Sequence, residues 1–293
     1  MQRTKHFINK KVEVIRNKGQ KATKKMADAK EEVTGAVAEK AKSAMEALPT
    51  FSIKGELAKL NEEDIHKEVI PVHCKLAASY GLLNKHTLKK MDDKLKVIIT
   101  ATTKAISKLD DYAWENVVSC MMNNPLLEPI EGAHINRSDK LIKEGFNVFD
   151  FDSSPDHVIV KEVHSWFVGL IKDEDILNDT HIDVDVMAKI VGQTGARINH
   201  IFALVAKRDY EERDIVDVGI LRYPDIEFPY FKLYRVRLIA WSECKRLLMI
   251  QKDCNGITGY FNCMKFKPRD QVIESLKEEV FNKAVADAEA LLG

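Results

Sequence analysis

Two pairs of aspartates are the residues whose type and spacing are best suited to chemistry. Asp150 and Asp152 stand two positions apart after an apolar stretch, and Asp179 and Asp183 follow further along the chain. A pair of carboxylates can supply a nucleophile with its acid/base partner, and it can also hold Mg²⁺. The elements around them must bring the two pairs together before either chemistry is available.

The stretch Val148–Ser154 resembles the first motif of haloacid-dehalogenase-like phosphatases. In that family an apolar strand delivers a nucleophilic aspartate and a second aspartate two residues later. The resemblance implies that Asp150 attacks and Asp152 transfers the proton. It also implies that Asp179 and Asp183 bind magnesium.

The spacing between the two pairs argues against this phosphatase interpretation. Too few residues separate them for the several strand-helix units that a parallel sheet of that class requires. The glycine that usually follows the second aspartate is replaced by Ser153. The sequence therefore favours a solvated turn that caps a helix beginning at Pro155.

A second short pattern contains two glycines three positions apart. Gly192-Gln193-Thr194-Gly195, followed by Arg197, resembles the G-x-x-G loop of K-homology RNA-binding modules, where glycine lets phosphates approach the backbone. No Lys or Arg lies between the glycines, and the flanking sequence is acidic, whereas an RNA groove requires positive charge. The alternative, which the sequence favours, is a helix whose two glycines allow a neighbouring element to approach closely.

Cysteine and histidine give no recognisable centre. The five cysteines are an odd number without C-x-x-C spacing, which indicates free thiols in a reducing compartment. His73 and Cys74 are adjacent, and on a helix their side chains would diverge by roughly 100°, so they cannot form a nucleophile-base dyad. Cys244, Cys254 and Cys263 share one region without nearby histidines, which does not predict zinc. The sequence therefore indicates no catalytic residue, metal or cofactor.

The N-terminal arm, residues 1–48, concentrates basic charge. Residues 1–27 carry nine Lys or Arg and one Glu, a formal charge of +8, and the rest of the neutral chain therefore carries −8. The arm has no proline and is rich in Lys, Ala and Glu, which predicts a long helix with a thin apolar stripe. Three interpretations remain open: a solvated tail, a helix lying on an anionic membrane, and a mitochondrial presequence or nucleic-acid arm.

We take the membrane interpretation as the functional hypothesis, because large apolar side chains and lysines occur together in the first turns. The residues assigned to lipid contact are Phe7, Ile8, Lys10, Lys11, Val12, Ile15, Arg16, Lys18, Lys21, Lys24 and Lys25.

After a linker, residues 56–293 are predicted to form one α+β domain. Helices are expected between residues 60 and 207, a β-meander of about four strands over 214–269, and a closing helix over 270–292. The helical N-terminal two-thirds of the chain would then pack on the C-terminal antiparallel meander.

Periodicity and turn residues also predict individual elements within this domain. Helices are expected from Asn61 to Tyr80, over 138–145 and over 183–207, the first of them kinked at a proline. A segment over 158–171 is apolar on nearly all sides and is expected to be a central buried helix. In the meander, a slip of the apolar phase predicts a bulge between Leu233 and Val236, and Asn255-Gly256 predicts a hairpin turn. Further helices are expected over 88–109 and 114–121.

The sequence thus predicts a cytoplasmic, non-enzymatic protein that binds a membrane peripherally. No run approaches the roughly 18 apolar residues that a membrane span requires. The expected partner is an anionic membrane surface; another protein is also possible, and nucleic acid ranks below both. The alternatives are RNA binding through the glycine loop and an enzyme whose site is assembled from scattered residues.

Overall fold

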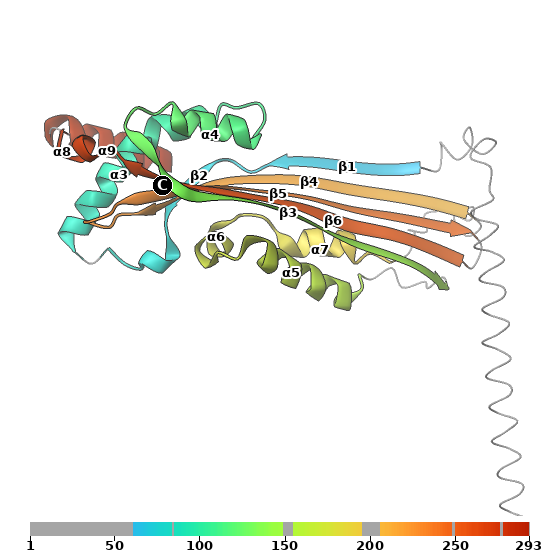
Figure 1. Ribbon diagram of the computed structural model, residues 1–293. Coiled ribbons are helices and arrows are strands. Elements are labelled where there is room, and N and C mark those ends of the chain that lie inside the picture. The colour runs from blue at the N-terminus through green and yellow to red at the C-terminus, as the bar shows by residue number, and fades with distance from the viewer. Residues whose placement is uncertain are drawn as a thin grey trace, which may run out of the picture.

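One mixed sheet of long strands forms the centre of the molecule (Figure 1). The computed structural model describes residues 61–83, 85–148, 155–194, 206–247, 250–275 and 278–292. Within these residues the six-stranded sheet has the order β1-β4-β5-β6-β3, and β2 also pairs with β4. Both β1 and β2 run parallel to β4, whereas the β4-β5, β5-β6 and β3-β6 pairs are antiparallel. The strands are β1 (Asn61–Val69), β2 (His73–Leu76), β3 (Leu127–Val148), β4 (Ala206–Tyr223), β5 (Tyr230–Leu247) and β6 (Ile250–Pro268).

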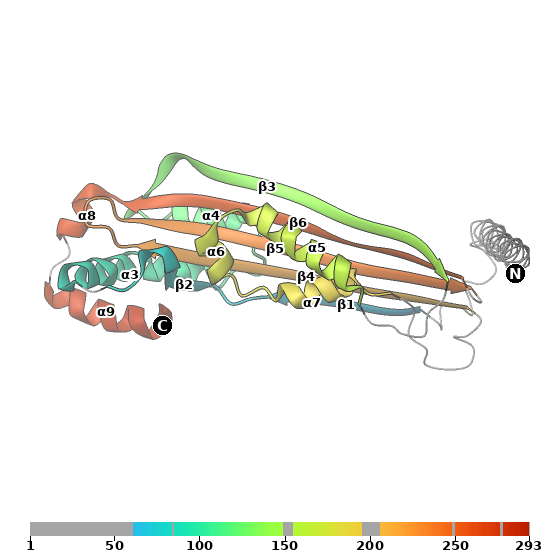
Figure 2. The ribbon, with the colours of Figure 1, turned by 90° about the horizontal axis from the view of Figure 1, so that it is seen from below.

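The helices form two groups around this sheet (Figures 1 and 2). Helices α5 (His157–Ile171), α6 (Glu174–Asp179) and α7 (Val184–Val191) lie along one face. A second group gathers at one end of the sheet, where α3 packs against α4 and α9. Its members are α3 (His86–Ile106), α4 (Trp114–Met122), α8 (Asp270–Ser275) and α9 (Glu278–Leu292), and the short 3₁₀ turn η1 is Ala78–Tyr80.

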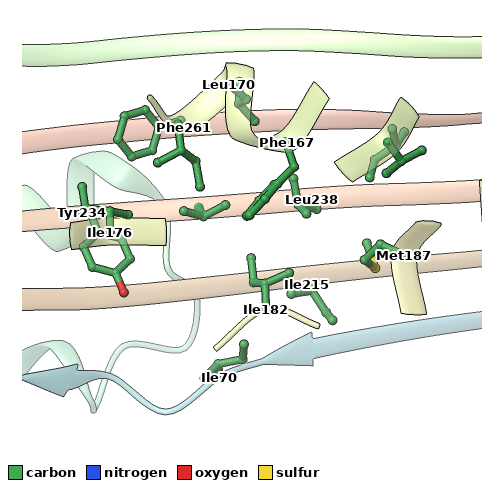
Figure 3. Packing of buried hydrophobic residues seen from close by; sticks show 14 of the residues in the cluster. Ile70, Phe167, Leu170, Ile176, Ile182, Met187, Ile215, Tyr234, Leu238 and Phe261 are labelled. Carbon is green, nitrogen blue, oxygen red and sulfur yellow. The ribbon is translucent and has the colours of Figure 1, made fainter. Parts of the chain in front are cut away.

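The two helix groups bury two separate apolar cores. The α5–α7 face covers Tyr234, Leu238 and other inward residues of β4, β5 and β6 (Figure 3). The opposite face carries Leu233 and Phe231 of β5 into the layer formed by α3 and α4. Strand β5 is therefore buried on both faces near its start, because successive side chains of a strand point to opposite sides of the sheet.

The predicted fold class, with a helical N-terminal two-thirds, is wrong. The stretch from Asn61 to Tyr80 forms β1, β2 and η1 instead of a kinked helix. Ile65 and Val69, which fitted a helical stripe, are 53% and 51% exposed on β1. Strands β1 and β2 form because they pair with β4, a partner far along the chain that local periodicity cannot indicate.

Two more predicted helices are strand or are shorter than expected. Residues 138–145 belong to β3, where Ser138 pairs with Tyr260 and Gly145 with Asp253. The predicted helix over 183–207 is represented by α7, which ends at Val191, and β4 has already begun at Ala206. Cross-strand pairing overrides helical propensity in β3, in which half of the residues are polar or charged.

The meander consists of three long strands, and the predicted turn and bulge are both absent from them. Asn255 and Gly256 lie inside β6, where Gly256 is opposite Trp241 of β5. The register of β5 is continuous on both sides, so no bulge separates Leu233 from Val236. The apparent phase slip has a different cause, because these two residues face the two different cores.

Several helices occur where the apolar spacing places them. Helices α3 and α4 match the expected segments, and α5 begins just after Pro155 with Asp156 as its N-cap. However, Val158 and Val168 of α5 are 73% and 53% exposed. Helix α5 therefore lies on the surface of the sheet and is not the central buried helix that was predicted.

Candidate functional site

A cluster of polar side chains lies where β2, the end of α6, β4 and β5 meet. We call it the His73 cluster. Its residues come from three distant parts of the chain, and its central members are buried or half-buried. They are His73 and Lys75 of β2, Asp179 with the following Thr180 and His181, Asp217 of β4 and Tyr234 of β5.

Strand β2 is short, and a buried ion pair on its other face fixes it in place. Arg222 of β4 donates to Asp92 of α3 at 2.8 Å and to the backbone oxygen of Cys74 at 3.0 Å. This contact ties β2, β4 and α3 together. Because adjacent residues of a strand point to opposite faces, Cys74 points toward the α3 layer and His73 toward the cluster.

Asp217 is the most deeply buried acid of the cluster, with a fully inaccessible side chain. Its Oδ1 lies 3.0 Å from Nε2 of His73. Its Oδ2 accepts hydrogen bonds from the hydroxyl of Thr180 at 2.7 Å and from the backbone N–H of His181 at 3.0 Å. Burial alone would raise the pKa of Asp217, but the contacts with His73, Thr180 and His181 outweigh it and lower the pKa below its ordinary value.

His73 lies between two buried carboxylates. Its Nδ1 is 3.5 Å from Oδ2 of Asp179, which is long for a hydrogen bond, and this nitrogen has no hydrogen-bond partner within the described residues. Asp179 accepts a hydrogen bond at 2.8 Å from the hydroxyl of Tyr234. The Tyr234 ring fits there because residue 219 is glycine: a Cβ atom on Gly219 would lie only 2.4 Å from it.

The open side of the cluster is formed by His181 and Lys75. The ring of His181 lies over that of His73, with centroids 4.1 Å apart. Nζ of Lys75 is 2.6 Å from Nε2 of His181 and 3.7 Å from Oδ1 of Asp179, and the lysine side chain is 48% exposed. Burial, His73 and Lys75 together lower the pKa of His181, so its neutral form is favoured.

This arrangement can share protons and hold a cation. The residues that could supply metal ligands are His73, His181 and Asp217, whose ligand atoms all lie within 4.8 Å of one another. The nearest thiol in sequence, Cys74, lies on the opposite face, and burial raises its pKa to about 11. Burial also raises the pKa of the other four thiols, and all five cysteines are free. None of them is therefore an activated nucleophile.

Two of the carboxylates named in the phosphatase interpretation, Asp179 and Asp183, have different surroundings. Asp179 belongs to the His73 cluster, whereas Asp183 is the N-cap of α7 and accepts from the backbone N–H of Val186. Asp150 and Asp152 lie outside the described residues. The structure therefore gives Asp179 and Asp183 separate roles.

The first half of the predicted RNA loop follows α7 directly. A Cβ atom on Gly192 would meet Cγ2 of Val160 at 3.1 Å, and its carbonyl accepts from the N–H of Asp156 at 2.7 Å. The carbonyl of Gln193 accepts from Nδ2 of Asn255 at 2.7 Å. Gly192 is thus a point of close approach between α7 and the start of α5.

The remaining predicted binding residues are not described. Thr194 ends the described stretch, and Gly195, Arg197 and the whole predicted lipid-binding arm lie outside the described residues.

The central residues of this cluster could not be recognised from the sequence. His73 was considered only as a partner of Cys74 on a helix, and His181, Asp217 and Tyr234 were not singled out. These residues have no metal-type spacing, since β2, α6 and β4 bring them together by long-range pairing. The one available clue was Asp217, a charged residue at an alternating position of a strand whose neighbours are apolar.

Comparisons with known proteins add no further support. No protein-family model matches the chain, and no curated protein sequence matches it significantly. One similar solved structure is described as "Structure of the Evf virulence factor"; it is 10% identical, covers 76% of this chain and 77% of that chain, and gives a TM-score of 0.19. A likeness at that level carries no argument about this chain.

Proposed function

We propose that this protein binds an anionic membrane surface reversibly through its N-terminal arm, residues 1–48. The observation that carries the proposal is the separation of charge, +8 on residues 1–27 against −8 on the remainder. Each basic residue close to an acidic leaflet contributes roughly 1 kcal/mol before screening. Insertion of Phe7, Ile8, Val12 and Ile15 would add an apolar contribution.

The described body is consistent with peripheral attachment. No helix within the described residues is both long enough and apolar enough to cross a membrane. The chain enters the sheet at Asn61, the start of edge strand β1, at the end of the sheet far from α8 and α9 (Figure 1).

Co-sedimentation with vesicles tests the proposal. Vesicles of phosphatidylcholine alone are compared with vesicles that also contain phosphatidylserine, at low and at physiological salt. Full-length protein should bind only the acidic vesicles, and added salt should weaken the binding because the Debye length falls to about 8 Å. Absence of binding to acidic vesicles at low salt would refute the proposal.

Two arm variants separate charge from insertion. Replacing Lys10, Lys11, Arg16 and Lys18 with glutamine should weaken binding and flatten its salt dependence. Replacing Ile8, Val12 and Ile15 with serine should weaken binding at every salt concentration, because it removes insertion and leaves the charge intact. A matched control variant replaces four exposed lysines of the body with glutamine: Lys67, Lys104, Lys108 and Lys189. This control should bind acidic vesicles as the parent does.

RNA binding through the glycine loop is the alternative that the same samples can test. If the protein binds membranes as we propose, a titration with single-stranded RNA should give no saturable binding. Tight RNA binding by a variant that lacks residues 1–48, together with failure of the vesicle assay, would favour the loop.

A further inference from the structure

The His73 cluster contains a preformed set of ligands on the covered face of the sheet. We propose that it binds one divalent transition-metal ion, such as zinc, through His73, His181 and Asp217. This site is independent of the arm, and its test does not depend on membrane binding.

The type and distance of the ligands suit a small transition-metal ion. Two imidazoles and one carboxylate favour zinc and its neighbours over calcium or magnesium, which prefer oxygen ligands. Zinc binds nitrogen and oxygen at about 2.0–2.2 Å, so neighbouring ligand atoms should be roughly 3.5 Å apart. Nε2 of His73 and Oδ1 of Asp217 are 3.0 Å apart, and the whole set lies within 4.8 Å. His181 has the exposed side chain, and its rotation can close the remaining gap.

The charges of the cluster also leave room for a divalent cation. Asp179 and Asp217 are two buried carboxylates whose side chains are 4% and 0% exposed. The ammonium of Lys75 lies near them, with Nζ 3.7 Å from Oδ1 of Asp179. One divalent ion carries two positive charges and would balance both carboxylates. Because Lys75 is half exposed, its ammonium can turn into water when the ion enters.

The contacts behind the ligands are those that orient a metal-bound imidazole. A histidine that binds metal through one nitrogen usually donates the other N–H to a carboxylate. If His73 binds through Nε2, its buried Nδ1 faces Asp179, which Tyr234 holds in place by the hydrogen bond at 2.8 Å. Asp217 is oriented in the same way, since Thr180 and the backbone of His181 occupy its second oxygen.

Titration calorimetry with Zn²⁺ on metal-free, full-length protein tests this inference. We expect one equivalent of Zn²⁺ to bind, and His181→Ala should raise the dissociation constant by about tenfold or more. The substitution keeps the backbone N–H that contacts Asp217, and His181 is exposed, so the fold should survive. Lys75→Gln, which removes the competing ammonium, should tighten binding by about threefold.

The chain offers a matched control. His164 and Asp185 form a second His-carboxylate pair, with Nε2 and Oδ1 2.8 Å apart and both side chains exposed. His164→Ala should leave zinc binding unchanged. Binding of Co²⁺ should give a visible absorption band that is present in this control and lost in His181→Ala. The inference is wrong if the parent binds no zinc saturably, or if His181→Ala binds zinc as tightly as His164→Ala does.

Discussion

Gly256 is required by the indole ring that lies across it. A Cβ atom at this position would lie 2.4 Å from Cζ2 of Trp241 and 2.9 Å from the backbone oxygen of Leu141. Lys140 approaches the same indole, with Nζ 5.0 Å from the ring centroid. A glycine inside a strand normally weakens it, and here an aromatic side chain on the neighbouring strand fills the space.

Gly256→Ala should therefore destabilise the protein by about 1–3 kcal/mol, because the ring or the strand must shift. Urea unfolding followed by circular dichroism measures the change. The matched control is Gly169→Ala in α5, where a Cβ atom meets nothing within 4 Å and alanine is the better helix former. That control should be neutral or stabilising by up to about 1 kcal/mol. Equal stability of Gly256→Ala and the parent would disprove the steric account.

Residue-level prediction from the sequence succeeded only where local chemistry decides the outcome. The pair Ser154-Pro155 predicted the start of α5, although the residue that caps it is Asp156. In contrast, Asn255-Gly256 has the composition of a tight turn and lies inside a strand. Asp179 was singled out as a magnesium ligand of a phosphatase, and it lies instead behind His73, at a position set by tertiary contacts.

At the scale of elements, burial on one side decided which segments could be recognised. Helices α3 and α4 each bury one apolar face, so their period of 3.6 residues is visible in the sequence. Strand β3 lies at a sheet edge and shows little alternation, while β5 is buried on both faces over part of its length. Neither pattern resembles the alternation expected of a half-buried strand, which explains why β3 was missed and β5 misread.

Deleting residues 1–48 should leave the melting temperature of the remainder within a few degrees of the parent value. Both described cores are formed by residues from Ile70 onward, and the apolar stripe of the arm is rich in alanine after its first turns. Removing it should therefore cost little packing. Differential scanning calorimetry of the two proteins gives the comparison. A drop of ten degrees would mean that the arm contributes to a core.

At the scale of the molecule, buried carboxylates set the response to acid. Asp175 accepts hydrogen bonds from Ser79, from its backbone and its hydroxyl, and from Tyr223, and it also lies near Lys232. Burial raises the pKa of Asp175, but these contacts outweigh burial and lower it, as they do for Asp217. A carboxyl whose folded pKa is depressed stabilises the fold above its unfolded pKa of about 3.9, and that stabilisation is lost as the pH falls through the folded value.

Asp175→Asn should accordingly lower the free energy of unfolding by about 1–3 kcal/mol at pH 7. The difference between parent and variant should shrink as the pH falls below the unfolded pKa of about 3.9 and through the lower folded value, because the parent then loses the charged form that the variant never had. Urea unfolding at a series of pH values measures both curves. A constant difference across this range would show that the carboxylate charge of Asp175 does not contribute.

The parallel pairing of β1 with β4 also determines the order in which this protein can fold as it is synthesised. Asn61 leaves the ribosome about 150 residues before its partner Arg208, an interval of roughly 7–30 s at 5–20 residues per second. A similar time separates the synthesis of β3 from that of its partner β6. During that interval the segments that become the two edge strands, β1 and β3, have no partner strand to pair with. Short connections join β4 to β5 and β5 to β6, so these two hairpins are the first part of the sheet that can form, although they are synthesised last. The strands synthesised earlier then add to the two sides of this sheet.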